Sequence, residues 1–130
     1  MADNNESGLS SQEIEAFARG LWYIATVDGD ADEREQTLIR EFLAEAKSDL
    51  DWATVSSGGF SPLETASFIE SSFLRRVFMK AAVAMVWADN VYTDNERRAI
   101  GEFADAFGLN NAEFGEIEQE AKRVDLAAAG

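Results

Sequence analysis

The sequence contains no cysteine, no histidine and a single proline, and its basic residues are few. Without thiols or imidazoles, the chain has no disulfides, thiolate nucleophiles or imidazole bases, and it lacks the ligands of nearly all structural zinc sites. The chain has only 11 Lys and Arg but 25 Asp and Glu, so its formal net charge is −14. We therefore expect no binding to nucleic acid or to anionic membrane surfaces. No apolar run approaches the roughly 20 residues of a membrane span, so direct membrane insertion is not expected either. Carboxylates are the only abundant reactive groups that remain.

The apolar content is nevertheless high. Hydrophobic residues make up 46% of the 130 residues and include nine Phe and three Trp, which are scarce in disordered chains. This length and composition predict one compact domain over residues 11–130, preceded by a flexible tail over 1–10. Since the start of the chain is polar and acidic, unlike a secretory leader, we expect a cytoplasmic protein.

Apolar residues recur at helical spacing nearly throughout, and strand-like alternation is nowhere sustained, so we predict an all-α fold, a compact bundle of six to seven helices. Pro62 suits the first position of its helix and Gly108 a left-handed helix end, and Asn110 or Asn111 can cap the last helix. In a capping box, an N-cap side chain and a glutamate three residues later bond each other's backbone, and four pairs fit: Ser10/Glu13, Asp32/Glu35, Ser61/Glu64 and Thr93/Glu96. The expected helices are 11–27, 33–48, 62–71, 73–88, 94–107 and 112–124, with a short turn near 50–55 and a flexible connection at 56–59.

The chain contains two related halves, approximately 14–48 and 75–109. A shift of 61 positions aligns six identical pairs: Phe17/Phe78, Asp28/Asp89, Glu35/Glu96, Ile39/Ile100, Glu41/Glu102 and Phe42/Phe103. Each half has the pattern of a helix–loop–helix hairpin with one apolar face. Since an isolated hairpin would leave that face exposed, we predict that two pseudo-symmetric hairpins pack around a shared core.

Each hairpin has an aspartate at the end of its first helix and a glutamate seven residues later, which are Asp28 and Glu35 in one copy and Asp89 and Glu96 in the other. The helix dipole disfavours an anion at a helix C-terminus by up to about 1 kcal/mol, so a repeated one calls for a compensating partner. Oxygen ligands suit hard cations such as Ca²⁺ and Mg²⁺, and the four carboxylates supply eight oxygens if the fold brings the loops together. We therefore predict a divalent-cation site formed by these four residues.

A simpler interpretation of the same residues is structural. Glu35 and Glu96 stand at the third position of capping boxes, and Asp28 and Asp89 can bond loop amides, without any metal. An EF-hand is not expected, because the positions at which its loop requires Gly and Glu hold other residues when counted from Asp28. Paired carboxylates can also perform acid–base chemistry, but nothing in the sequence resembles a sugar-binding cleft, so we predict no enzymatic activity and no catalytic residue.

The basic residues and the tryptophans are expected to have structural roles. We interpret the one basic group of the chain as a solvated face, with pairing to the acidic hairpin or docking of a partner as alternatives. Its members are Arg75, Arg76 and Lys80 on one helix, with Arg97 and Arg98 nearby in the sequence. The three tryptophans are expected to fill the core rather than to stack on ligands; they are Trp22, Trp52 and Trp87.

The paired Asp-Gly-loop-Glu hairpins resemble the TerB (tellurite-resistance) family and the wider TerB-like domains over roughly residues 11–124. The family pattern is an apolar helix, Ala-x-x-Asp-Gly-x-Ile-x-x-x-Glu and an amphipathic helix, present twice. The matching positions here are Ala25, Asp28, Gly29, Ala31 and Glu35, and then Asp89, Asn90, Tyr92 and Glu96. Asn90 replaces the second Gly, and Ala31 and Tyr92 replace the usual aliphatic residue.

The resemblance implies a compact all-helical bacterial domain without enzymatic activity, whose acidic residues in these motifs bind a divalent metal; by position they are Asp28, Glu35, Asp89 and Glu96. It also implies a role in tellurite and other stress responses, with protein partners that include other Ter-type proteins at the membrane. We therefore expect a non-enzymatic, divalent-cation-binding scaffold in a bacterial stress-response system. The alternative is a metal-free acidic interaction module that docks a basic partner protein.

Overall fold

The computed structural model describes residues 10–27, 33–46, 50–87 and 93–119. Within these ranges the chain forms helices and no strand, which confirms the predicted all-α class. None of the described helices is long and apolar enough to cross a membrane. The predicted helix positions agree with the observed bounds to within a few residues. The helices are α1 (Ser11–Ala25), α2 (Glu33–Glu45), α3 (Trp52–Ser56), α4 (Pro62–Phe68), α5 (Ser72–Trp87) and α6 (Asp94–Phe107), and residues 111–119 form a further helical segment.

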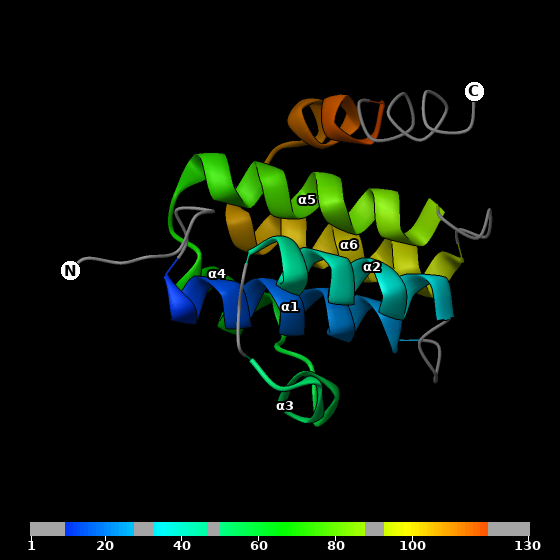
Figure 1. Cartoon of the computed structure of the whole chain (residues 1–130). Helices are drawn as coiled ribbons and strands as arrows, with labels where there is room; N and C mark the ends of the chain where they lie inside the picture. Colours follow the sequence, from blue (N-terminus) through cyan, green and yellow to red (C-terminus); the bar gives the residue numbers. More distant parts are fainter. Residues whose placement is uncertain (1–9, 28–32, 47–49, 88–92, 120–130) are drawn as a thin grey trace.

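The four long helices form two pairs that pack against each other (Figure 1). α1 lies against α2 and α5 lies against α6, as the repeat predicts, while α1 also contacts both α5 and α6. The short helices cover α1 from outside: α3 contacts α1, and α4 contacts α1 and α6. α1 is therefore the central element of the bundle, since it touches each helix from α2 to α6.

Four phenylalanines link the two pairs of helices. Phe17 of α1 stacks on Phe42 of α2 with ring centroids 4.4 Å apart, and at the equivalent positions Phe78 of α5 and Phe103 of α6 lie 5.0 Å apart. Phe17 and Phe78 also meet edge to face at 5.2 Å, which joins one half to the other. Such aromatic pairs contribute about 0.5–1.5 kcal/mol beyond the burial of their surface. The sequence repeat thus corresponds to equivalent packing of both halves around one continuous hydrophobic core.

The connection between α3 and α4, predicted to be flexible, is packed against α1. The Nε of Arg19 donates a hydrogen bond to the Gly58 carbonyl (2.8 Å), and the Arg19 carbonyl accepts one from the Phe60 N–H (3.0 Å). A Cβ added at Gly59 would lie 2.5 Å from the Cα of Tyr23, a distance that real Cβ atoms essentially never show. The glycine therefore serves the close approach of two backbones, which the prediction of a flexible connection did not anticipate.

The predicted capping residues are confirmed where the structure describes them. Both bonds of the capping box are present at the starts of α1, α4 and α6. Gly108 ends α6 with a φ of +79°, and Asn110 starts the segment 111–119 through a further capping box with Glu113. Asp32, the predicted N-cap of α2, lies outside the described residues, as does the predicted tail except for Ser10.

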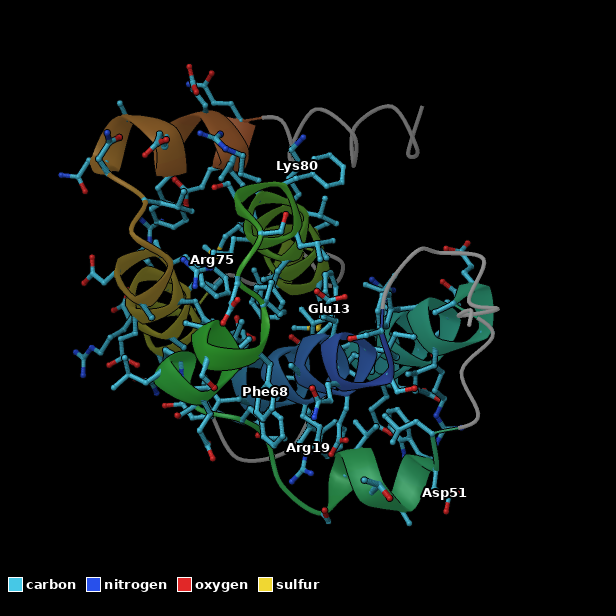
Figure 2. All side chains as sticks on the ribbon, turned by 90° about the vertical axis from the view of Figure 1, so that its left-hand side faces the viewer. Glu13, Arg19, Asp51, Phe68, Arg75 and Lys80 are labelled. Atoms are coloured by element: carbon cyan, nitrogen blue, oxygen red, sulfur yellow. The ribbon has the colours of Figure 1, made fainter. Side chains whose placement is uncertain are left out.

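Arg75, which the sequence assigned to a solvated basic face, is turned toward the ends of α4 and α6 (Figure 2). Its guanidinium donates hydrogen bonds to three carbonyls, those of Ile69 (2.6 Å), Ala66 (3.0 Å) and Phe107 (3.3 Å). The neighbouring Arg76 instead pairs with Glu113 at 2.6 Å, and both of these side chains are partly exposed. The interpretation of a solvated face is therefore wrong for Arg75, because the carbonyl ends of two helices converge on its side chain.

Candidate metal centre

The two helix pairs place their loop ends at the same end of the bundle. α1 and α5 end there, and α2 and α6 begin there (Figure 1). Glu35 and Glu96 occupy the first turns of α2 and α6. The other two predicted ligands, Asp28 and Asp89, lie outside the described residues. The fold thus places the helix starts on which both glutamates stand at the same end of the bundle.

Glu35 and Glu96 are buried, with 2% and 6% of their surface exposed. They are the only charged residues that are buried within the described ranges. Taking a carboxylate out of water costs several kcal/mol unless it is paired or hydrogen-bonded. Two such residues at equivalent positions of the repeat therefore mark a place where the protein compensates negative charge.

Helix capping accounts for part of that compensation. The Thr93 N–H donates to Oε1 of Glu96 at 3.1 Å, and the Glu96 N–H donates to Oγ1 of Thr93 at 3.1 Å. The predicted capping role is thus confirmed for Glu96, whereas Asp32, the predicted capping partner of Glu35, lies outside the described residues. Because the capping bond engages one carboxylate oxygen, a cap and a cation can share the same glutamate.

Three other glutamates make the same capping bond without being buried. The N-cap N–H donates to Oε1 of Glu13 at 2.9 Å, of Glu64 at 2.9 Å and of Glu113 at 3.0 Å. Glu64 is exposed, and Glu13 and Glu113 are half-buried. Capping alone therefore does not require the burial that distinguishes Glu35 and Glu96.

The described residues supply only part of a coordination sphere. Among them, no three acidic side chains lie close enough to hold an ion together. Glu35 has interaction partners, and its Oε2 atom, which is shielded from solvent, accepts no hydrogen bond from the described part of the chain. Ca²⁺ takes six to eight oxygens, so two glutamates would need further ligands from the adjoining segments 28–32 and 88–92 or from water. An oxygen-only donor set fits Ca²⁺ or Mg²⁺, and the set of four carboxylates stays a prediction.

Trp22 and Trp52, expected to fill the core, are half-buried and pack against its outside. Trp22 and Trp52 meet edge to face at 5.5 Å, and the guanidinium of Arg40 lies 4.3 Å from the centroid of the Trp52 ring. These contacts hold α3 against α1 and α2. The side chain of Trp87 is outside the described part of the structure.

Sequence reasoning found the buried glutamates but missed what distinguishes them. Glu35 and Glu96 share the capping pattern with exposed glutamates, and their place in the repeat is the one signal that sets them apart. A hollow between α4 and α6 has no comparable signal, because its two walls are about 40 positions apart in the sequence.

Comparison with known proteins identifies no relative of this chain. No family model, no curated protein and no solved structure matches it significantly. The resemblance to TerB-like domains, and the functions that this resemblance implies, therefore remain predictions from the two acidic motifs.

Proposed function

We propose that this protein is a non-enzymatic, divalent-cation-binding scaffold in a bacterial stress-response complex. The observation that supports cation binding is the burial of Glu35 and Glu96, at equivalent positions and at the same end of the bundle, while other glutamates with the same capping role are exposed or half-buried. The stress-response role, with protein partners that include Ter-type proteins at the membrane, comes from the resemblance to TerB-like domains.

In this proposal the cation is Ca²⁺ or Mg²⁺, held by Glu35 and Glu96 together with the predicted ligands Asp28 and Asp89. The ion would neutralise carboxylates that otherwise repel one another. Because α2 belongs to one helix pair and α6 to the other, a shared ion would also join the two halves. The protein would then present its acidic surface to partners in one conformation.

Thermal unfolding of the full chain tests cation binding. After treatment with chelator, the protein is unfolded with and without millimolar Ca²⁺, Mg²⁺ or Mn²⁺. An ion at 100 times its Kd stabilises the folded state by about 2.7 kcal/mol. For 130 residues, with an unfolding entropy of about 2.1 cal/mol/K per residue, this corresponds to a rise in Tm of about 10 °C.

Glutamine variants separate cation binding from capping. Glutamine can also fill the third position of a capping box, so Glu35→Gln and Glu96→Gln remove charge while the cap is retained. Both variants are expected to lose the cation-dependent rise in Tm. Glu64→Gln, which alters an exposed glutamate in the same capping role, is the matched control and should keep it. The proposal fails if no cation changes the Tm of the wild type. It also fails if Glu64→Gln loses as much of the cation-dependent rise in Tm as Glu96→Gln does.

A second candidate function is a metal-free module that docks a basic partner protein. The large excess of acids supports it, since the described acidic residues other than Glu35 and Glu96 are exposed or half-buried. Partner binding by such a module weakens steeply with ionic strength but survives chelator. A cation-dependent scaffold shows the reverse sensitivity to chelator, so one binding assay distinguishes the two.

A further inference from the structure

The end of the bundle opposite the candidate metal centre presents exposed apolar side chains. Leu63 in α4 is 77% exposed and Phe73 at the start of α5 is 73% exposed. α4 and the start of α5 lie together at that end (Figure 1). Single exposed apolar residues are common on protein surfaces, so an exposed leucine marks a candidate interaction site only when a second feature, such as a hollow, lies beside it.

A hollow adjoins Leu63 between α4 and α6. Its volume is about 420 Å³ and its wall is mostly apolar. We call this hollow the α4–α6 groove, because the start of α4 lines one side and α6 lines the other. The lining residues are Ser61, Pro62, Leu63, Glu102, Asp105 and Ala106. A second hollow of about 370 Å³ lies toward the segment 111–119, and Glu102 and Asp105 line it as well.

Two acidic side chains therefore stand between two hollows. Glu102 and Asp105 are exposed and lie three residues apart, so they project from the same side of α6. Within the described ranges, neither side chain takes part in an ion pair or a hydrogen bond. A ligand of this surface must fill an apolar hollow and at the same time bring positive charge to its edge.

We propose that the α4–α6 groove binds a basic amphipathic segment of another protein. An apolar side chain of that segment occupies the hollow beside Leu63, and lysines or arginines lie next to Glu102 and Asp105. Grooves between helices commonly accept the apolar face of an amphipathic helix. A second copy of this chain does not fit, because each copy has a net charge of −14 and the two would repel each other. Anionic lipid is disfavoured for the same reason.

This inference gives the second candidate function a location, and it does not depend on cation binding. The probe is a synthetic fluorescent peptide of leucine and lysine at helical spacing, about 14 residues or four turns long. Its affinity for the full chain is measured by fluorescence anisotropy in the presence of chelator. NMR spectra recorded during the titration show which residues the peptide touches, and we expect the shifted signals to lie in α4 and α6.

Three variants test the groove. Leu63→Ser should weaken binding by about tenfold, since the leucine is buried only in the complex. Glu102→Gln with Asp105→Asn should weaken it by about three- to tenfold at low salt, and this difference should vanish at high salt. The matched control is Glu41→Gln with Glu45→Gln, which removes the same charge from exposed positions of α2, a helix packed against α1 and α5.

The outcomes separate this inference from its alternatives. If the double variants in α6 and α2 lose equal amounts of peptide affinity, the peptide is attracted by net charge alone and the proposed groove is refuted. The inference also fails if Leu63→Ser binds as the wild type does, or if a peptide with glutamate in place of lysine binds equally well. A wild type that sediments as a dimer, converted to a monomer by Leu63→Ser, would identify a second copy as the occupant. Because Leu63 is exposed, an unchanged Tm is expected for its variant.

Discussion

Replacement of Arg75 by methionine is expected to destabilise the bundle strongly, although Arg75 lies in a basic group that the sequence marks as solvated. Methionine retains an unbranched apolar stem but removes the guanidinium, which donates to the carbonyls of Ala66, Ile69 and Phe107. These carbonyls belong to the C-terminal ends of α4 and α6, where helices lack intrahelical donors and where a cation is favoured by the dipole.

The magnitude follows from these three bonds. A hydrogen bond from a charged donor contributes about 1.5–3 kcal/mol to stability. The three bonds share one guanidinium, and the bond to Phe107 is long at 3.3 Å, so their contributions do not add fully. We expect a loss of about 3 kcal/mol in the free energy of unfolding, which lowers the Tm of a 130-residue domain by about 11 °C.

Denaturant and thermal unfolding followed by circular dichroism measure this loss. Arg76→Met is the matched control, because Arg76 is the next residue on α5 and its ion pair with Glu113 is partly exposed. Such pairs contribute at most about 1 kcal/mol. The loss of stability in Arg75→Lys should lie between those of Arg76→Met and Arg75→Met, since an ammonium group cannot reach three carbonyls as the planar guanidinium does. If Arg75→Met costs no more than Arg76→Met, the carbonyl contacts do not stabilise the junction of α4, α5 and α6.

Two further predictions concern packing. Gly59→Ala should destabilise the fold by about 1–3 kcal/mol, because its Cβ would meet the backbone of Tyr23, whereas Gly101→Ala, with open space around it in α6, should stabilise by up to about 1 kcal/mol. Equal effects of the two substitutions on denaturant midpoints would contradict the close approach of the connection to α1. Phe78→Ala should cost about 3–5 kcal/mol, since Phe78 is fully buried, and Phe73→Ala, at a 73% exposed position of the same helix, should change stability by less than about 0.5 kcal/mol. Similar midpoints for these two variants would show that the aromatic cluster does not join the halves.

The proposed cation site involves the first turns of α2 and α6, whereas the α4–α6 groove is lined by the start of α4 and the second half of α6, so the two can be tested separately. Glu96→Gln is expected to abolish the effect of cations on Tm and to leave peptide binding in chelator unchanged. Leu63→Ser is expected to weaken peptide binding and to leave the effect of cations on Tm unchanged. A scaffold that uses both sites would hold a partner segment in the groove while an ion fixes the two helix pairs at the starts of α2 and α6.

Much of the fold could be predicted because its signals are local. The starts of α1, α4 and α6 follow from a serine or threonine and a glutamate three residues apart, whose bonds form within a single helical turn. The end of α6 follows from Gly108, which adopts a left-handed backbone without steric cost. The repeat also predicted the pairing of helices, since Phe17 and Phe42 pack as Phe78 and Phe103 do.

By itself, then, the sequence determined the helical class, the helix starts, the two matched halves and the choice of carboxylates as the candidate ligands. Only the tertiary structure decided which of those carboxylates are buried, because Glu96 and Glu64 have the same local pattern and differ in what packs over them. It also decided that Arg75 faces helix carbonyls, and that an open, mostly apolar hollow lies between α4 and α6 beside two acids. These features depend on contacts between segments far apart in the chain, and burial and electrostatic environment arise only when such segments meet.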